Sequence, residues 1–298
     1  MLKHARSIRP LVLLAAISLA GCLGYRTPML DPNQSNPTSP RLARDASADL
    51  ASDLPRSDAQ TACPAERKYV LVLGDDGQLY RFDAGTLALT SLATVDCGDD
   101  GLNSLTVSPI GSAYISGQTG ALCSVDLRTF QATRTAFNPL TVGYYSYGMA
   151  LLPDNSAAGQ TLFIAVGEDV DVNHLQRIDL TDFTLSSVGY ISPAVPWAEL
   201  TAGPNGELYG FSVGATQSLL LNIDPKTASA IDVTTVEAGF ESGAFALVYW
   251  QDYFYLFLGD QYSSGSAVYS YRKGNAQVTP LGSIDATIIG AGVACASN

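Results

Sequence analysis

Six residues of the chain combine the side-chain types that a binding site for a sugar or a peptide needs. They comprise two aromatic residues, three carboxylates and one amide, each in or beside a polar connection that leads into an apolar strand: Asn103, Tyr147, Trp197, Glu199, Glu241 and Asp285. Aromatic rings offer flat apolar faces for stacking, and carboxylates and amides orient the polar edges of a ligand. The alternative is that these are ordinary turn residues and packing aromatics. We expect a ligand-binding surface if the fold gathers these connections.

Three of these residues also permit a catalytic interpretation. Glu199, Glu241 and Asp285 would supply the paired carboxylates, one acid and one nucleophile or base, with which glycosidases work. No motif around them matches such an enzyme. A Ser-His-Asp arrangement would depend on His174, the one histidine after the signal segment, and the chain has no GxSxG motif. A carbohydrate-active hydrolase is therefore the alternative to binding without catalysis.

The stretch GEDVDVNH places Asp169, Asp171 and Asn173 at alternating positions, as at the start of a calcium-binding loop. An EF-hand needs glycine at the sixth position, where this chain has His174, and no glutamate follows six residues later. A calcium site is the alternative to a plain acidic hairpin, which we favour. The sequence has no phosphate-cradling glycine loop and no haem or flavin motif, so we expect neither a metal nor a cofactor.

The elements that position these residues repeat along the chain. Five segments read as an alternating apolar strand, a polar turn such as DAGT, DLRT or DPKT, and a Thr/Val/Leu-rich strand. The turn residues Asp83, Asp126, Asp179 and Asp224 are 43, 53 and 45 residues apart, and Tyr271 follows 47 residues later. The aspartate is expected to cap each turn, with Pro or Gly supplying the backbone angles. A period in the forties with several short strands per unit predicts β-propeller blades.

The repeats predict an all-β, five-bladed propeller of four-stranded antiparallel blades. A second strand pair precedes most units, but the first unit has only YVLVLG before it, and the segment TIIGAGVACAS at the other end follows the last unit. The C-terminal strand should therefore join the first blade beside residues 69–73, which also removes two open sheet edges. The connections into the five innermost strands would then surround one mouth of the central channel.

Four cysteines are expected to form two disulfides. Cys63 precedes the first strand and Cys295 lies in the last one, so their bond would close the ring at its seam. Cys97 and Cys123 would then join neighbouring blades, although the spacing alone leaves the other two pairings open. A zinc site is the competing interpretation, and we discount it because no pair has ligand spacing and an exported protein meets oxidising conditions.

The N-terminus has the features of a secretory signal. Basic residues precede about ten apolar residues, too few for a membrane-spanning helix, and small residues follow. The stretch Leu19–Cys22 resembles the bacterial lipobox, which implies cleavage after residue 21 and lipidation of Cys22. Leu23 in place of an aspartate resembles outer-membrane lipoproteins. Residues 22–67 would be the lipidated cysteine and a Pro-, Ser- and Asp-rich flexible linker, and residues 68–298 the propeller.

The region after the linker is acidic, with 8 Lys and Arg against 22 Asp and Glu, a net charge of −14. Such a body repels nucleic acid, so we expect no nucleic-acid partner. The repeats, with GQLYRFDAGT and GELYGF among them, resemble the bacterial extracytoplasmic β-propellers with WD40-, Kelch- or YVTN-like blades, over residues 68–296. This resemblance implies the fold and leaves the activity open. We expect an envelope-anchored lipoprotein that binds a glycan, a peptide or an envelope protein without catalysis. A third possibility is a structural module that recruits a partner through its blade edges.

Overall fold

The structure, a computed structural model, describes residues 63, 68–99, 101–138, 147–154, 156, 158–169, 172–214, 217–236, 242–260, 264–275 and 277–295. The chain divides into two units, Met1–Leu54 and Pro55–Asn298, and every described residue belongs to the second. The predicted signal peptide and Cys22 lie outside the described residues, as does all of the predicted linker except Cys63. Within the described residues, no helix is long and apolar enough to cross a membrane.

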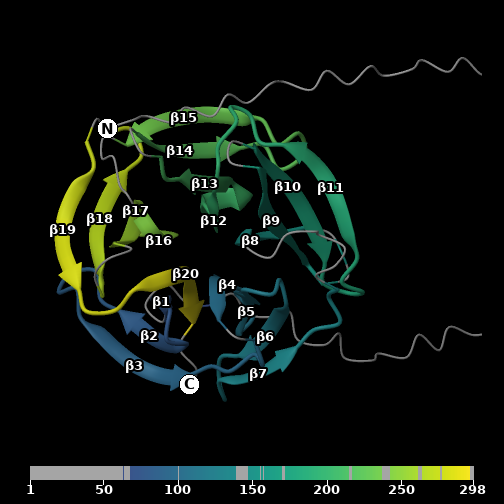
Figure 1. Cartoon of the computed structure of the whole chain (residues 1–298), viewed down its shortest axis with the longest axis horizontal. Coiled ribbons are helices and arrows are strands. Elements are labelled where there is room, and N and C mark those ends of the chain that lie inside the picture. The colour runs from purple at the N-terminus through teal and green to yellow at the C-terminus, as the bar shows by residue number, and fades with distance from the viewer. Residues whose placement is uncertain are drawn as a thin grey trace, which may run out of the picture. The chain divides into compact units, whose positions relative to one another are not determined.

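Five sheets of four antiparallel strands surround a central channel, as the repeats predict (Figure 1). Each sheet is a blade, and its first-named strand is the innermost. Blade 1 contains β20 (Ile288–Cys295), β1 (Lys68–Gly74), β2 (Gln78–Phe82) and β3 (Leu89–Thr94). Blade 2 contains β4 (Leu102–Val107), β5 (Ser112–Gly117), β6 (Leu122–Asp126) and β7 (Gln131–Arg134).

The other three blades follow in chain order. Blade 3 contains β8 (Tyr147–Pro153), β9 (Gln160–Asp169), β10 (Val172–Asp179) and β11 (Leu185–Tyr190). Blade 4 contains β12 (Glu199–Ala202), β13 (Leu208–Ser212), β14 (Ser218–Ile223) and β15 (Ala230–Val236), with a 3₁₀ turn, η3 (Pro204–Gly206), between β12 and β13. Blade 5 contains β16 (Ser242–Trp250), β17 (Tyr253–Asp260), β18 (Ser266–Arg272) and β19 (Thr279–Ile284).

The two ends of the propeller meet in blade 1, which confirms the predicted ring closure. Strand β20 pairs antiparallel with β1, with Tyr69 opposite Ala294 and Leu73 opposite Gly290. Cys63, which precedes β1 in the chain, forms a disulfide with Cys295 at the end of β20. Without β20, the inner edge of β1 would have no pairing strand. The β20–β1 ladder and the disulfide therefore close the ring at the same seam.

The second predicted disulfide is not formed. Cys97 and Cys123 are buried free thiols in the wall between blades 1 and 2. The Cys123 thiol instead points at the backbone carbonyl of Cys97, with 3.7 Å between sulfur and oxygen. A hydrogen bond between the two thiols, together with burial, raises the pKa of Cys97.

The hydrophobic core lies between the blades. The buried apolar residues form five clusters, one at each interface between neighbouring blades; the interface of blades 1 and 2, for example, contains Leu71, Leu105 and Ile115. The innermost strands approach closely because glycine occupies the contact points. A Cβ atom on Gly148 would collide with the backbone of Ala198, and one on Gly290 with the backbone of Leu105. Alternation of apolar residues along each strand thus packs both faces of every blade.

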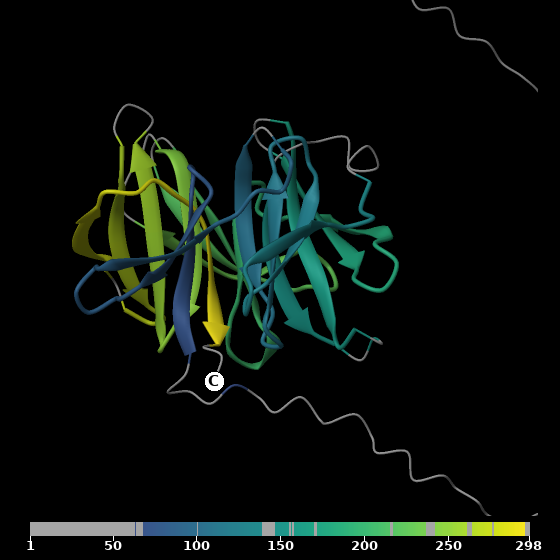
Figure 2. The same ribbon diagram turned by 90° about the horizontal axis from the view of Figure 1, so that it is seen from below.

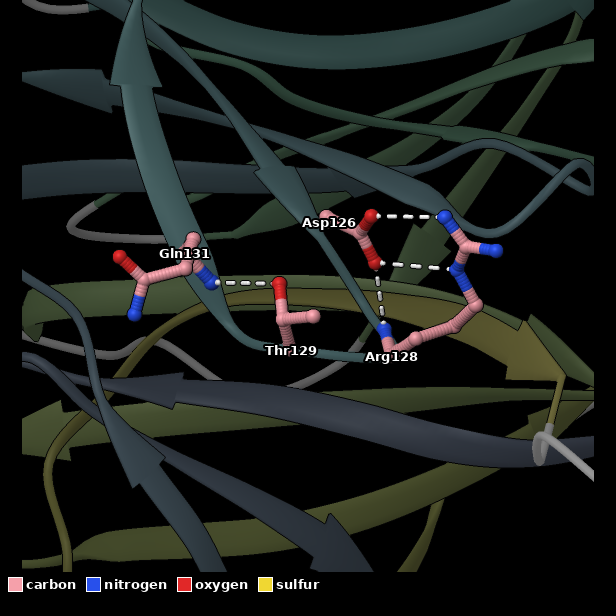
Figure 3. A network of polar contacts seen from close by, with 4 residues as sticks. All are labelled: Asp126, Arg128, Thr129 and Gln131. Atoms are coloured by element: carbon pink, nitrogen blue, oxygen red, sulfur yellow. Dashed lines mark hydrogen bonds and ion pairs between the residues drawn. The ribbon is translucent and has the colours of Figure 1, made fainter.

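The repeated aspartates cap the turns between the third and fourth strands of blades 1 to 4, as predicted. Each carboxylate accepts a hydrogen bond from the backbone N–H two residues later, at 2.7–2.9 Å. Figure 3 shows the case of Asp126, which also pairs with the guanidinium of Arg128 at 3.0 Å, while the Thr129 hydroxyl accepts from the N–H of Gln131. The backbone angles differ from the prediction. The left-handed residue is neither Pro nor Gly but lies four positions after each aspartate: Leu87, Phe130, Phe183 and Ala228, with φ of 57–62°.

Candidate functional site

A cavity of about 800 Å³ opens where the innermost strands begin. Five of the six predicted binding residues line it: Asn103, Tyr147, Trp197, Glu199 and Asp285. They come from four different connections, so the propeller brings together residues that are up to 182 positions apart in sequence. Glu241, the sixth, lies outside the described residues. The cavity lies at the start of β20, and the end of this strand lies at the lower face in Figure 2.

Three of the innermost strands enter the cavity wall through β-bulges. The extra residues are Asn103 in β4, Gly243 in β16 and Ile289 in β20, and all three line the cavity. A bulge inserts one residue into a strand and re-aims its side chain. The Asn103 side-chain amide donates a hydrogen bond to the carbonyl of Tyr147 at 3.2 Å, from blade 2 to blade 3.

Trp197 presents an aromatic face to the cavity. Its indole lies against Gly167 of β9, where a Cβ atom would stand only 2.9 Å from the ring. The absence of a side chain at Gly167 therefore lets the ring lie on the strand. With 46% of its surface exposed, Trp197 has free apolar area at the mouth. An exposed indole beside polar groups is the arrangement expected for ligand stacking.

Tyr147 lines the cavity from within the wall between blades 2 and 3. It is buried, its ring packs edge-to-face against Phe137, and its hydroxyl donates to the carbonyl of Gly120 at 3.0 Å. Burial raises the pKa of this phenol. Tyr147 thus supports the wall between blades 2 and 3, and very little of its surface is exposed.

Glu199 is a buried carboxyl group in the cavity wall. The Ser104 hydroxyl donates to its Oε1 at 2.5 Å, and the backbone N–H groups of Met149 and Leu200 donate to the same carboxyl. These partners belong to blades 2, 3 and 4, so the group ties three blades together. Burial raises the pKa of Glu199 well above its usual range, and the three donors only partly oppose this shift.

The blade 1 side of the cavity carries further acids that were not among the predicted residues. Asp75 and Asp76 lie in the turn between β1 and β2, and the N–H of Asp75 donates to the carbonyl of Thr287 at 2.9 Å. This bond brings the turn beside the connection that carries Asp285. Burial and the carboxylates of Asp76 and Asp75 raise the pKa of Tyr80, which also lines the cavity. Gln118 and Phe245 complete the polar and aromatic lining from blades 2 and 5.

Of the residues of the calcium alternative, Asp169 ends β9 and Asn173 is the second residue of β10. Asn173 is buried, its side-chain amide donates to the carbonyl of Val195 at 3.1 Å, and its Oδ1 has no partner in the structure. Asp171 and the side chain of Asp169 lie outside the described residues. Among the residues that the structure describes, no three His, Cys, Asp or Glu side chains are grouped to hold a metal ion.

No protein-family model matches this chain, and no curated protein does. Solved structures with a similar fold include a chain of a nidogen/laminin complex, at 10% identity and a TM-score of 0.49, covering 78% of this chain and 100% of that one. Hydrazine synthase of Kuenenia stuttgartiensis matches at 14% identity and a TM-score of 0.42, covering 77% of this chain and 69% of that one. TolB of Acinetobacter baumannii matches at 13% identity and a TM-score of 0.43, covering 76% of this chain and 56% of TolB.

Proposed function

We propose that this protein is an envelope-anchored lipoprotein whose propeller binds a ligand in the cavity at the mouth of its channel, without catalysis. The observation that carries the proposal is the cavity of about 800 Å³ in which the exposed indole of Trp197 lies among carboxylates and amides. A concave surface with one aromatic face and several convergent polar groups is the usual form of a small-ligand site.

The position of the disulfide suits a tethered receptor. Cys63 is bonded to Cys295 at the end of β20, whereas the cavity lies at the start of the same strand, about 25 Å away for eight extended residues. The N-terminal segment therefore joins the propeller on the face opposite the cavity. An anchor at Cys22, reached through this segment, leaves the mouth free to face away from the membrane.

The binding proposal is tested by titrating the protein with saccharides, short peptides and organic amines in a thermal-shift screen. We expect at least one class to raise the melting temperature, because a ligand that binds only the folded state stabilises it. Trp197→Ala should reduce the shift, because it removes the aromatic face from the cavity. The matched control is Tyr253→Ala, which removes another exposed aromatic side chain at the start of β17, far from the cavity. A shift of the same size in Trp197→Ala and wild type would place the binding elsewhere.

The anchor is tested separately. Labelling with [³H]palmitate should be lost in Cys22→Ala, and the variant protein should appear in the soluble fraction. Equal labelling of Cys22→Ala and wild type would contradict the lipoprotein proposal and leave the cavity proposal untouched.

Hydrolysis remains the second candidate because of one observation, the raised pKa of Glu199 in the cavity wall. A buried carboxyl of this kind is the usual general acid of a glycosidase. Turnover of aryl glycosides that disappears in both Glu199→Gln and Asp285→Asn would favour the hydrolase. We expect no turnover, because the Glu199 carboxyl is already hydrogen-bonded to three groups of the wall.

A further inference from the structure

The cavity is lined by negative charge without a compensating cation. Its exposed carboxylates are those of Asp75, Asp76 and Asp285, beside the buried carboxyl group of Glu199, and none of its described lining residues is Lys, Arg or His. Asp75, Asp76 and Asp285 take part in no ion pair within the described part of the chain. Carboxylates that share a cavity without a countercharge repel one another, so a bound positive charge would relieve this repulsion.

The basic residues of the propeller lie mostly at the end away from the cavity. Seven of its eight Lys and Arg residues lie toward the strand ends and turns far from the cavity: Lys68, Arg81, Arg128, Arg177, Lys226, Arg272 and Lys273. The eighth, Arg134, ends the outermost strand of blade 2. The polar connections into the innermost strands contain no basic residue in the sequence. A cleft lined by charge of one sign concentrates ligands of the opposite sign and speeds their association.

The aromatic wall suits the same class of ligand for an independent reason. The half-exposed indole of Trp197 is the best side chain for a cation–π contact, and Tyr80 and Phe245 line the cavity as well. An ammonium or guanidinium group on an apolar chain can pair with the carboxylates while the chain packs against the aromatic wall. A neutral sugar would use the aromatic face and could donate hydrogen bonds to the carboxylates, but it would leave their negative charge uncompensated, and an anion would be repelled.

We propose that the ligand of this cavity is an organic cation, with ammonium or guanidinium groups toward Asp75, Asp76 and Asp285 and its apolar part against Trp197. The inference rests on the proposed binding function and specifies the chemical class of its ligand. The cavity volume of about 800 Å³ accommodates a molecule of the size of a linear polyamine.

The test is calorimetric titration of the intact propeller with spermidine and agmatine, each at low and at raised salt concentration. We expect saturable binding that weakens as salt rises, because the carboxylates are solvent-accessible and therefore screened. Spermidine acetylated on all three nitrogens, which has the same chain without charge, should bind at least about tenfold more weakly. In Asp75→Asn/Asp76→Asn/Asp285→Asn the affinity should fall by about tenfold or more, from about two- to fivefold for each carboxylate.

The triple variant should keep its fold, because Asp76→Asn retains the oxygen that accepts from the N–H of Gln78 in the turn. Two further variants serve as comparisons. Asp232→Asn removes an exposed carboxylate from the outer strand β15 and should leave spermidine affinity unchanged. Trp197→Ala should weaken spermidine by about two- to fivefold.

The inference is overturned if spermidine and agmatine do not bind, or if the triple variant binds them as wild type does. A neutral saccharide whose binding is lost in Trp197→Ala would overturn the charge inference alone and leave the cavity as a binding site. If no probe of any charge binds, the proposed function fails together with it.

Discussion

At the scale of single residues, Glu199 stands apart from the other acids of the cavity. Asp75, Asp76 and Asp285 are exposed, whereas Glu199 is only 6% exposed and accepts all of its hydrogen bonds from the propeller wall. Because its hydrogen-bond partners come from three blades, the buried carboxyl group of Glu199 stabilises the fold as well as lining the cavity. Its ionisation is opposed by burial, so the fold and the protonation of this group are linked.

We therefore expect the stability of the protein to fall as pH rises. Because the folded-state pKa of Glu199 lies above its unfolded value of about 4.3, its favourable contribution is complete below that value and is lost as pH rises through the folded-state pKa. Glu199→Gln keeps a carbonyl acceptor without a charge and should remove this loss. Its melting temperature at about pH 9 should exceed that of wild type by about 2–4 °C, the shift that about 1 kcal/mol produces in a domain of this size.

The measurement is thermal unfolding from about pH 5 to about pH 9 for wild type, Glu199→Gln and Ser104→Ala. The serine variant loses a hydrogen bond but keeps the carboxyl group, so it should be less stable at every pH and retain the dependence on pH. Parallel pH curves for wild type and Glu199→Gln would show that the titration of Glu199 contributes nothing.

At the scale of elements, the turns after the third strands share one backbone conformation that the sequence pattern reveals only in part. The capping aspartates are visible as a repeat because a carboxylate accepting from the N–H two residues on needs Asp at that position. The left-handed residue four positions later varies between Leu, Phe and Ala. Nothing in those side chains indicates positive φ, so tertiary closure of the turn imposes it.

This conformation predicts an unusual response to glycine. At Ala228, with φ of 62°, a glycine would relieve about 1–2 kcal/mol of left-handed strain and lose a buried methyl group and some unfolded-state rigidity. These effects nearly cancel, so Ala228→Gly should change the free energy of unfolding by less than about 1 kcal/mol. The control Ala113→Gly, an equally buried alanine inside β5, should destabilise by about 1–2 kcal/mol in chemical denaturation. Similar losses at both positions would show that Ala228 is unstrained.

The site was predictable to the extent that it follows from connectivity. The connections into the innermost strands meet at one mouth whatever their conformation, which is why five predicted residues share a cavity. Asp75 and Asp76 were not predicted because they lie in the turn between β1 and β2, and not in a connection into an innermost strand. That turn is nevertheless at the cavity end of blade 1. The side chains of Tyr147 and Glu199 are buried in the wall, where they hydrogen-bond to neighbouring blades. The sequence could not predict this burial, because the spacing of residues along the chain does not give the distances between blades.

At the scale of the whole molecule, the propeller is a ring in which four blades are local in sequence and one is not. Blades 2 to 5 each use four consecutive strands, but blade 1 takes three strands from one end and β20 from the other. Pairing strands that are far apart in sequence is slow and carries a large loop-closure entropy cost. A covalent bond at this seam therefore contributes more to the stability of the propeller than one between residues close in sequence. The second residue of the same strand, Ile289, lines the cavity, so one strand takes part in both the ring closure and the site.

We expect the double variant Cys63→Ser/Cys295→Ser to lose about 2–5 kcal/mol of unfolding free energy, because the bond joins residues 232 positions apart and restricts the unfolded chain. Chemical denaturation of this variant should match that of the wild type under reducing conditions. Reductant should leave the variant itself unchanged, since Cys97 and Cys123 are already free thiols. If the variant were as stable as the oxidised wild type, the ladder between β20 and β1 would close the ring unaided. If reductant also destabilised the variant, Cys97 and Cys123 would have to be bonded in the native protein.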